Sequence, residues 1–163
     1  MQISKVLTKD VEYIQGVNPI DLLPSTHIKP SIIVVILDKH YTPGSHLVAL
    51  CFFDSGYAKY FDSYGLPTYK LEIMSYLKNH SISWTFNHQS LQVLTSKVGG
   101  YYCCLYAFHR ARGLSMTLFP SMFSPARYRC NVIRAVRMLR AQFGNCPACS
   151  QLEHQQQSCK SQV

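Results

Sequence analysis

The apolar residues of this chain gather in short runs that predict a β-sheet. Residues 31–37 form a β-branched run, Ser-Ile-Ile-Val-Val-Ile-Leu, which is typical of a buried strand. Residues 46–53 and 57–62 make two further apolar strands, and the Asp-Ser-Gly turn between them predicts a hairpin. A short strand is expected near residues 82–86. Residues 19–31 contain three prolines and predict an irregular approach to the sheet.

Two segments of the chain show the apolar periodicity of helices. Residues 68–79 carry apolar side chains from Leu71 to Leu77 at helical spacing, which predicts a helix ahead of the last strand. Residues 99–112 place aromatic residues and cysteines at intervals of three and four on one side. Gly113 fits a left-handed stop after them. We therefore expect a buried helix over this second segment.

The segment 125–143 predicts a last helix with two different faces. Arginines recur every three residues from Arg134 to Arg140 on one face. This face is the best candidate for a groove that binds a polyanion. The residues expected to point inward are Val132, Ile133, Val136, Leu139 and Phe143.

Length and composition favour one domain with a tail. A chain of 163 residues with 47% hydrophobic content can bury one core of ordinary size. We assign residues 1–144 to a single domain and residues 145–163 to a polar tail. No apolar run approaches the roughly 18 residues that span a bilayer, and the first residues lack the features of a secretory signal. We expect no membrane partner and an intracellular location, cytoplasmic, nuclear or within a virion.

Positive charge is confined to one part of the chain. Residues 1–96 hold seven lysines against seven acidic residues, whereas residues 97–163 hold two lysines, all seven arginines and one acid. The whole net charge of +8 therefore belongs to the second part. Arginine makes bidentate contacts with phosphate, so DNA is one candidate partner, and a basic surface that only confers solubility is the alternative. The candidate phosphate contacts are Arg127, Arg129, Arg134, Arg137 and Arg140.

The seven cysteines are expected to be reduced thiols, because their number is odd and no secretion signal precedes them. Cys146, Cys149, His154 and Cys159 have the spacing of a retroviral-type zinc knuckle, and such ligands can close a tetrahedral zinc site. The aromatic residue and glycines of such knuckles are missing here, which favours a disordered tail with accidental cysteines. No other cofactor is required.

Four positions suggest the chemistry of a cysteine protease. His46 begins one predicted strand, and Asp62 follows the next strand sixteen residues later. Gln92 lies seven residues before Gly99, where the buried helix begins. A thiol at the helix start would complete the set of groups that a cysteine protease needs, because helix dipoles lower thiol pKa values.

The order and spacing of these residues resemble the adenain-like cysteine endopeptidases of adenoviruses, Maverick/Polinton transposons and adintovirus-like elements. The resemblance extends from about residue 17 to about residue 143. It implies an α+β fold in which a mixed sheet is flanked by helices, as in adenain and the SUMO proteases. It also implies that His46 is the base, that Asp62 orients it and that Gln92 serves the oxyanion hole.

Two positions depart from the family pattern. Leu47 replaces the aromatic residue that usually follows the histidine, and Gly99 stands where the family has its nucleophilic cysteine. Cys103, one helical turn further on, could act only if the helix start shifted. The resemblance thus implies a viral or transposon maturation endopeptidase that is inactive as written and whose partner is a structural polypeptide. The alternative is a non-catalytic module that binds protein or DNA on a protease fold.

Overall fold

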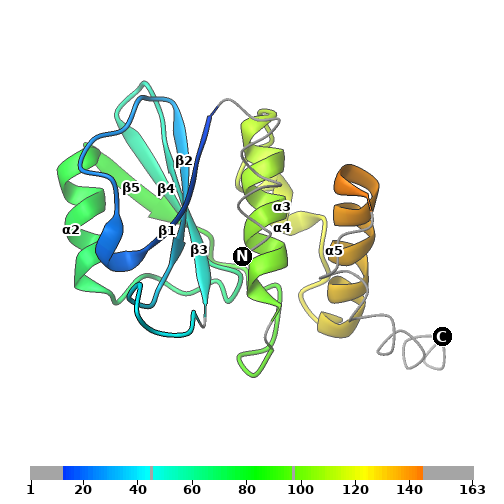
Figure 1. Ribbon diagram of the computed structural model, residues 1–163. Helices are drawn as coiled ribbons and strands as arrows, with labels where there is room; N and C mark the ends of the chain where they lie inside the picture. The colour runs from blue at the N-terminus through cyan, green and yellow to red at the C-terminus, as the bar shows by residue number, and fades with distance from the viewer. Residues whose placement is uncertain (1–12, 45, 97, 145–163) are drawn as a thin grey trace.

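The computed structural model describes residues 13–44, 46–96 and 98–144. The fold is α+β, with one five-stranded mixed sheet flanked by helices (Figure 1), so the coarse fold class is confirmed. The strands are β1 (Ile14–Pro19), β2 (Ser31–Ile36), β3 (Leu47–Phe52), β4 (Tyr57–Phe61) and β5 (Ser83–Phe86). Four of them lie where the apolar runs predicted them. The edge strand β1 was not expected, because its sequence is short and includes glycine and asparagine.

The strands follow one another across the sheet in sequence order. The central pairs β2–β3 and β3–β4 are antiparallel, and the outer pairs β1–β2 and β4–β5 are parallel. The predicted hairpin is present, with Ala49 opposite Phe61 and Phe52 opposite Ala58. Because β3 and β4 are antiparallel, the start of β3 and the end of β4 lie at the same end of the sheet.

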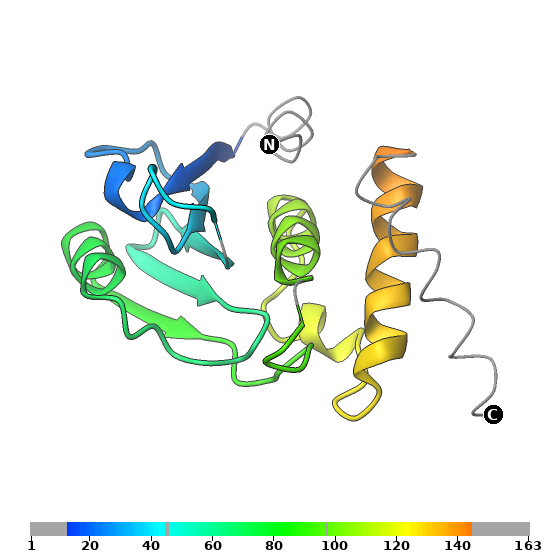
Figure 2. The same cartoon turned by 60° about the horizontal axis from the view of Figure 1, so that its bottom comes forward.

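Helices cover both faces of the sheet. A short 3-10 turn, η1 (Ile20–Leu22), and helix α2 (Leu71–His80) lie on one side, and helix α3 (Gly99–Ala111) lies on the other. Figure 2 shows α3 between the sheet and helix α5 (Tyr128–Phe143), with the short helix α4 (Leu118–Ser121) in the connection. No helix in these described ranges is long and apolar enough to cross a membrane.

The alternation of β2 side chains explains its uninterrupted apolar sequence. Ile32 and Val34 pack in the core beneath α3, and Ile33 and Val35 pack in the second core beneath α2. A strand that is covered on both faces needs apolar residues at every position. The run 31–36 is accordingly buried throughout its first five residues.

Helix α3 is the buried helix that the sequence predicts. It packs on β2 and β3 with one side and on α5 with another, and eight of its residues are buried. In α5, Val136 and Leu139 are buried as expected, but Val132, Ile133 and Phe143 are only half-buried. Asn131 and Ala135 occupy buried positions instead. The buried asparagine bonds the loop that precedes α3, a role that apolar periodicity does not reveal.

Candidate functional site

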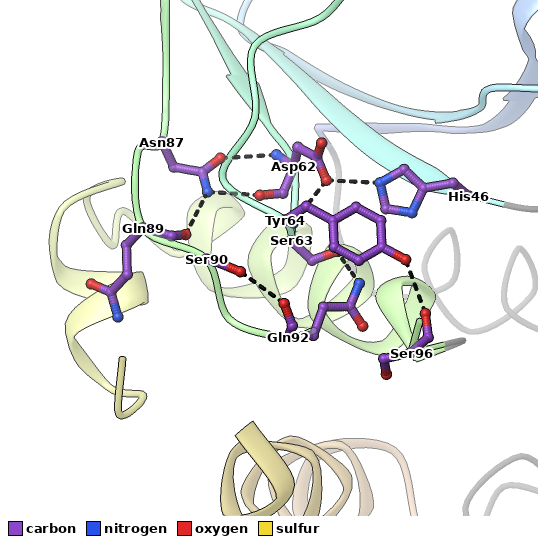
Figure 3. Close-up of polar contacts among 9 residues, drawn as sticks. All are labelled: His46, Asp62, Ser63, Tyr64, Asn87, Gln89, Ser90, Gln92 and Ser96. Atoms are coloured by element: carbon purple, nitrogen blue, oxygen red, sulfur yellow. Dashed lines mark hydrogen bonds and ion pairs between the residues drawn. The ribbon is translucent and has the colours of Figure 1, made fainter. Parts of the chain in front are cut away.

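Sheet topology brings the four predicted site positions together at one end of the sheet. Figure 3 shows His46, Asp62 and Gln92 there. His46 directly precedes β3, and Asp62 directly follows β4. Strand β5 is parallel to β4, so the loop that follows it and carries Gln92 leaves the sheet at the same end. That loop leads into α3, whose first residue is Gly99.

His46 and Asp62 form a close, largely buried pair. The Nε2 atom of His46 lies 2.7 Å from Oδ1 of Asp62, and the two side chains are 15% and 7% exposed. The same carboxylate oxygen accepts a hydrogen bond of 2.9 Å from the backbone N–H of Tyr64. The carboxylate therefore fixes the ring through Nε2 and leaves Nδ1 directed to the other side.

Asn87 holds the backbone of Asp62 from behind. Its Oδ1 accepts the Asp62 N–H at 2.8 Å, and its Nδ2 donates to the Asp62 carbonyl at 2.7 Å and to the Gln89 carbonyl at 3.2 Å. Asn87 is 4% exposed, so these bonds are shielded from water. It is a support residue that sequence reasoning missed, because a single asparagine after a strand carries no distinguishing spacing.

Tyr64 covers one face of the imidazole. Its ring stacks on His46 with 4.6 Å between centroids, and its hydroxyl donates to the Ser96 carbonyl at 2.9 Å. Burial, together with the nearby Asp62 charge, raises the pKa of Tyr64, which keeps the hydroxyl a donor. Of the three aromatic residues near Asp62, Tyr64 contacts His46, while Tyr60 and Phe61 pack into the two cores.

Gln92 reaches the site from the loop between β5 and α3. Its Nε2 donates to Ser63 Oγ at 2.7 Å, and the backbone N–H of Leu91 donates to the Ser63 carbonyl at 2.9 Å. Gln92 is 2% exposed, and its Oε1 atom is buried without a hydrogen-bond partner. The amide is thus anchored by one end and has an unused acceptor at the other.

The loop that carries Gln92 is held from two sides. Asn131 of α5 donates to the Leu91 carbonyl at 3.3 Å, and Gln89 donates to the carbonyls of Pro120 and Phe123. On the other side Gly65, with φ of +70°, approaches so closely that an added Cβ would lie 2.7 Å from backbone atoms of residues 89 and 90. Only glycine fits that contact.

Gly99 faces the two side chains that would serve a nucleophile. A Cβ atom built on its backbone would lie 3.0 Å from Nδ1 of His46, 3.1 Å from Cε1 of the same ring and 2.9 Å from Nε2 of Gln92. Gly99 itself is buried. The structure therefore brings His46, Asp62, Gln92 and Gly99 into one constellation, and its arrangement suits a base, an orienting acid and an oxyanion donor around position 99.

Cys103, one turn further along α3, is unsuited to act as a nucleophile. It is fully buried in the core beneath α3, and burial, reinforced by Cys104, raises the pKa of its thiol well above the usual value. A thiol is a nucleophile only as thiolate, so this environment makes it unreactive.

The other predicted groups lie apart from this constellation. Arg127, Arg129, Arg134 and Arg137 are exposed along α5 or at its start, and Arg140 is half-buried. The proposed zinc ligands Cys146, Cys149, His154 and Cys159 fall outside the described residues. Within those residues, no group of three or more side chains is placed to hold a metal ion.

Comparison with known sequences gives no relative on which a function could rest. No protein-family model matches the chain, and no curated protein matches it significantly.

Proposed function

We propose that this chain is an adenain-like cysteine endopeptidase domain, of the kind that matures viral or transposon structural polypeptides, and that Gly99 leaves it without peptidase activity. One observation carries the proposal. The Cβ position of residue 99 lies 3.0 Å from His46 Nδ1 and 2.9 Å from Gln92 Nε2, while His46 Nε2 bonds Asp62 at 2.7 Å. Residue type, order and geometry all fit one reaction.

The roles follow from the direction of each group. With Nε2 bonded to Asp62, the His46 ring can take a proton from a thiol at position 99 through Nδ1 and later return it to the leaving amine. The Gln92 Nε2 hydrogens and the first backbone N–H groups of α3 can stabilise the oxyanion. Glycine offers no atom to attack a peptide bond. In subtilisin the loss of the nucleophile costs about 10⁶ in turnover.

The alternative is a non-catalytic module that keeps the protease fold in order to bind protein or DNA. Two observations favour this alternative. A Cβ at position 99 would lie 2.9 Å from Gln92 Nε2, which is too close, and 3.0 Å from His46 Nδ1, which is tight, so the site as it stands fits glycine best. The exposed arginines of α5 also offer a basic face that the peptidase reaction does not use.

The test of the peptidase proposal is Gly99→Cys. The added Cβ must displace the ends of two side chains by a few tenths of an ångström, which the Gln92 amide can accommodate. Paired with His46, the new thiol should react with iodoacetamide at neutral pH about tenfold faster or more than an ordinary cysteine, because its thiolate fraction is larger. Exposed Cys130 in the same molecule provides the internal reference, since both sites are read by mass spectrometry of the same sample.

Two further variants sharpen the experiment. Gly99→Cys combined with His46→Ala should bring the rate back to that of Cys130, and Gly99→Ala should report whether the fold tolerates the added carbon atom. Among these variants, only Gly99→Cys with His46 intact should hydrolyse an unfolded protein substrate. A thiol at position 99 that reacts no faster than Cys130, with or without His46, contradicts the proposal.

A further inference from the structure

The constellation around Gly99 holds an imidazole and an amide donor but lacks the negative charge that a cysteine would add. In a Cys–His pair the thiolate is the counter-charge of the imidazolium. Here Asp62 engages only Nε2, and the nitrogen atoms His46 Nδ1 and Gln92 Nε2 converge on the Cβ position of residue 99, from 3.0 Å and 2.9 Å. The start of the thirteen-residue helix α3 adds backbone N–H groups and the positive end of the helix dipole.

Gln92 supplies an independent sign of a missing partner. Its Oε1 atom is buried and accepts no hydrogen bond, although the residue is 2% exposed. Buried acceptors without a partner are uncommon and costly in folded proteins. Figure 3 shows the Gln92 amide beneath the Tyr64 ring, with one hydrogen bond from its nitrogen and none at its oxygen. The site therefore calls for a ligand with both an anionic acceptor and a donor.

We propose that this site binds the C-terminal carboxylate of a peptide. The carboxylate accepts from protonated Nδ1 of His46, from Gln92 Nε2 and from the N-terminal turn of α3. The N–H of the terminal peptide group donates to Gln92 Oε1. The proposal rests on the proposed function, because peptide cleavage creates a free C-terminal carboxylate. An endopeptidase site without a nucleophile would then retain a chain end of this kind.

Glycine at position 99 favours such a ligand in two ways. It allows the terminal residue to approach the start of α3 closely. It also removes the thiolate, whose charge would repel a carboxylate at short range. An added Cβ would lie 2.9–3.1 Å from Gln92 and His46 and would push these donors apart.

Apolar side chains beside the site favour a peptide over a small free anion. Leu66 lies two residues after Tyr64 and is 45% exposed, and Val93 and Leu94 follow Gln92 with 46% and 73% exposure. The loops that carry them are joined through Ser63 and Gly65. These three residues can cover the side chains that precede a peptide C-terminus, whereas acetate can use only the polar donors.

The experiment compares two pools of short acetylated peptides of mixed sequence that differ only in their C-terminus, free acid or amide. Binding to the native chain is followed by the side-chain NMR signals of His46 and Gln92. The acid pool should bind about tenfold or more tightly than the amide pool, because a charge-assisted hydrogen bond is lost in the amide. Sodium acetate should shift the same signals only at much higher concentration. Equal binding of acid and amide overturns the proposal, as does acetate binding as tightly as the acid pool.

Variants separate this inference from the peptidase proposal. Gly99→Ala, His46→Gln and Gln92→Leu should each remove the preference for the acid pool, and His88→Gln, an exposed histidine near the end of β5, should preserve it. Loss of the preference in His88→Gln as well would contradict a local site. A reactive thiol in Gly99→Cys together with no acid preference in the native chain refutes carboxylate binding alone. An unreactive thiol in Gly99→Cys, together with a preference for the acid pool in the native chain, refutes the peptidase proposal alone.

Discussion

At the scale of single residues, the site shows how far chemistry depends on one side chain. His46, Asp62 and Gln92 surround position 99, and under the proposed function Gly99 leaves this arrangement without a nucleophile. A scaffold that only binds protein has no need of the His46–Asp62 pair. Binding of a peptide carboxylate would give His46 and Asp62 each a role, because His46 would contact the ligand and Asp62 would stabilise the His46 ring in that complex.

Asn87 is expected to be the most important support of the pair. Replacing it by alanine leaves the buried N–H of Asp62 unpaired, whereas the Asp62 carbonyl keeps the hydrogen bond of 2.9 Å that it accepts from the Gly65 N–H. Asn87→Ala should lower the free energy of unfolding by about 1–3 kcal/mol in urea titrations. Ser90→Ala is a matched control, since it removes a single half-buried bond in the same loop. Equal losses in the two variants would show that Asn87 has no special role.

At the scale of elements, the sequence predicted what periodicity can express. The β2 run, the β3–β4 hairpin, β5 and the helices α2, α3 and α5 lie where apolar spacing placed them. The edge strand β1 and the short α4 were missed, because β1 is covered less and α4 spans only four residues. His46 was predicted from its spacing to Asp62 and Gln92 from its spacing to Gly99, both through the family resemblance, whereas Asn87 and Asn131 act through backbone bonds that leave no sequence signal.

Helix α5 presents the arginines expected to track phosphates. At about 100° per residue, Arg129 and Arg140 lie about 20° apart around the helix, and Arg134 and Arg137 lie within the same half. If this face binds DNA, affinity should be independent of sequence and fall with salt at a log–log slope of about −0.9 per phosphate neutralised. Replacing Arg134 and Arg137 by glutamine should make that slope shallower in fluorescence titrations.

Arg112 provides the matched control for this prediction. It is an exposed arginine at the end of α3, where it stacks on Phe108, and it lies outside the α5 face. Arg112→Gln should therefore change the salt slope less than the α5 variants do. A slope near zero for the native chain, or equal effects of all three replacements, would instead indicate a basic surface that serves solubility.

At the scale of the whole molecule, stability depends on two cores that lie on opposite faces of one sheet. The candidate site is built over the core beneath α3, and the core beneath α2 contains no site residue. The second core includes Phe52 and Tyr76, which contact the ring of His27. Changes at His27 should therefore alter global stability without touching the constellation around Gly99.

His27 is expected to make the fold sensitive to acid. Burial, with smaller contributions from His80 and Lys29, lowers the pKa of His27 from 6.5 to about 4. Between these two values the unfolded chain binds more protons than the folded chain, so the free energy of unfolding should decrease as the pH falls from about 6.5 to about 4. His27→Phe keeps a ring against Phe52 but cannot be protonated, so urea unfolding of this variant should depend less steeply on pH across that window. Part of the slope should remain, because burial also lowers the pKa of His80. An unchanged slope in His27→Phe would show that other groups govern the acid response.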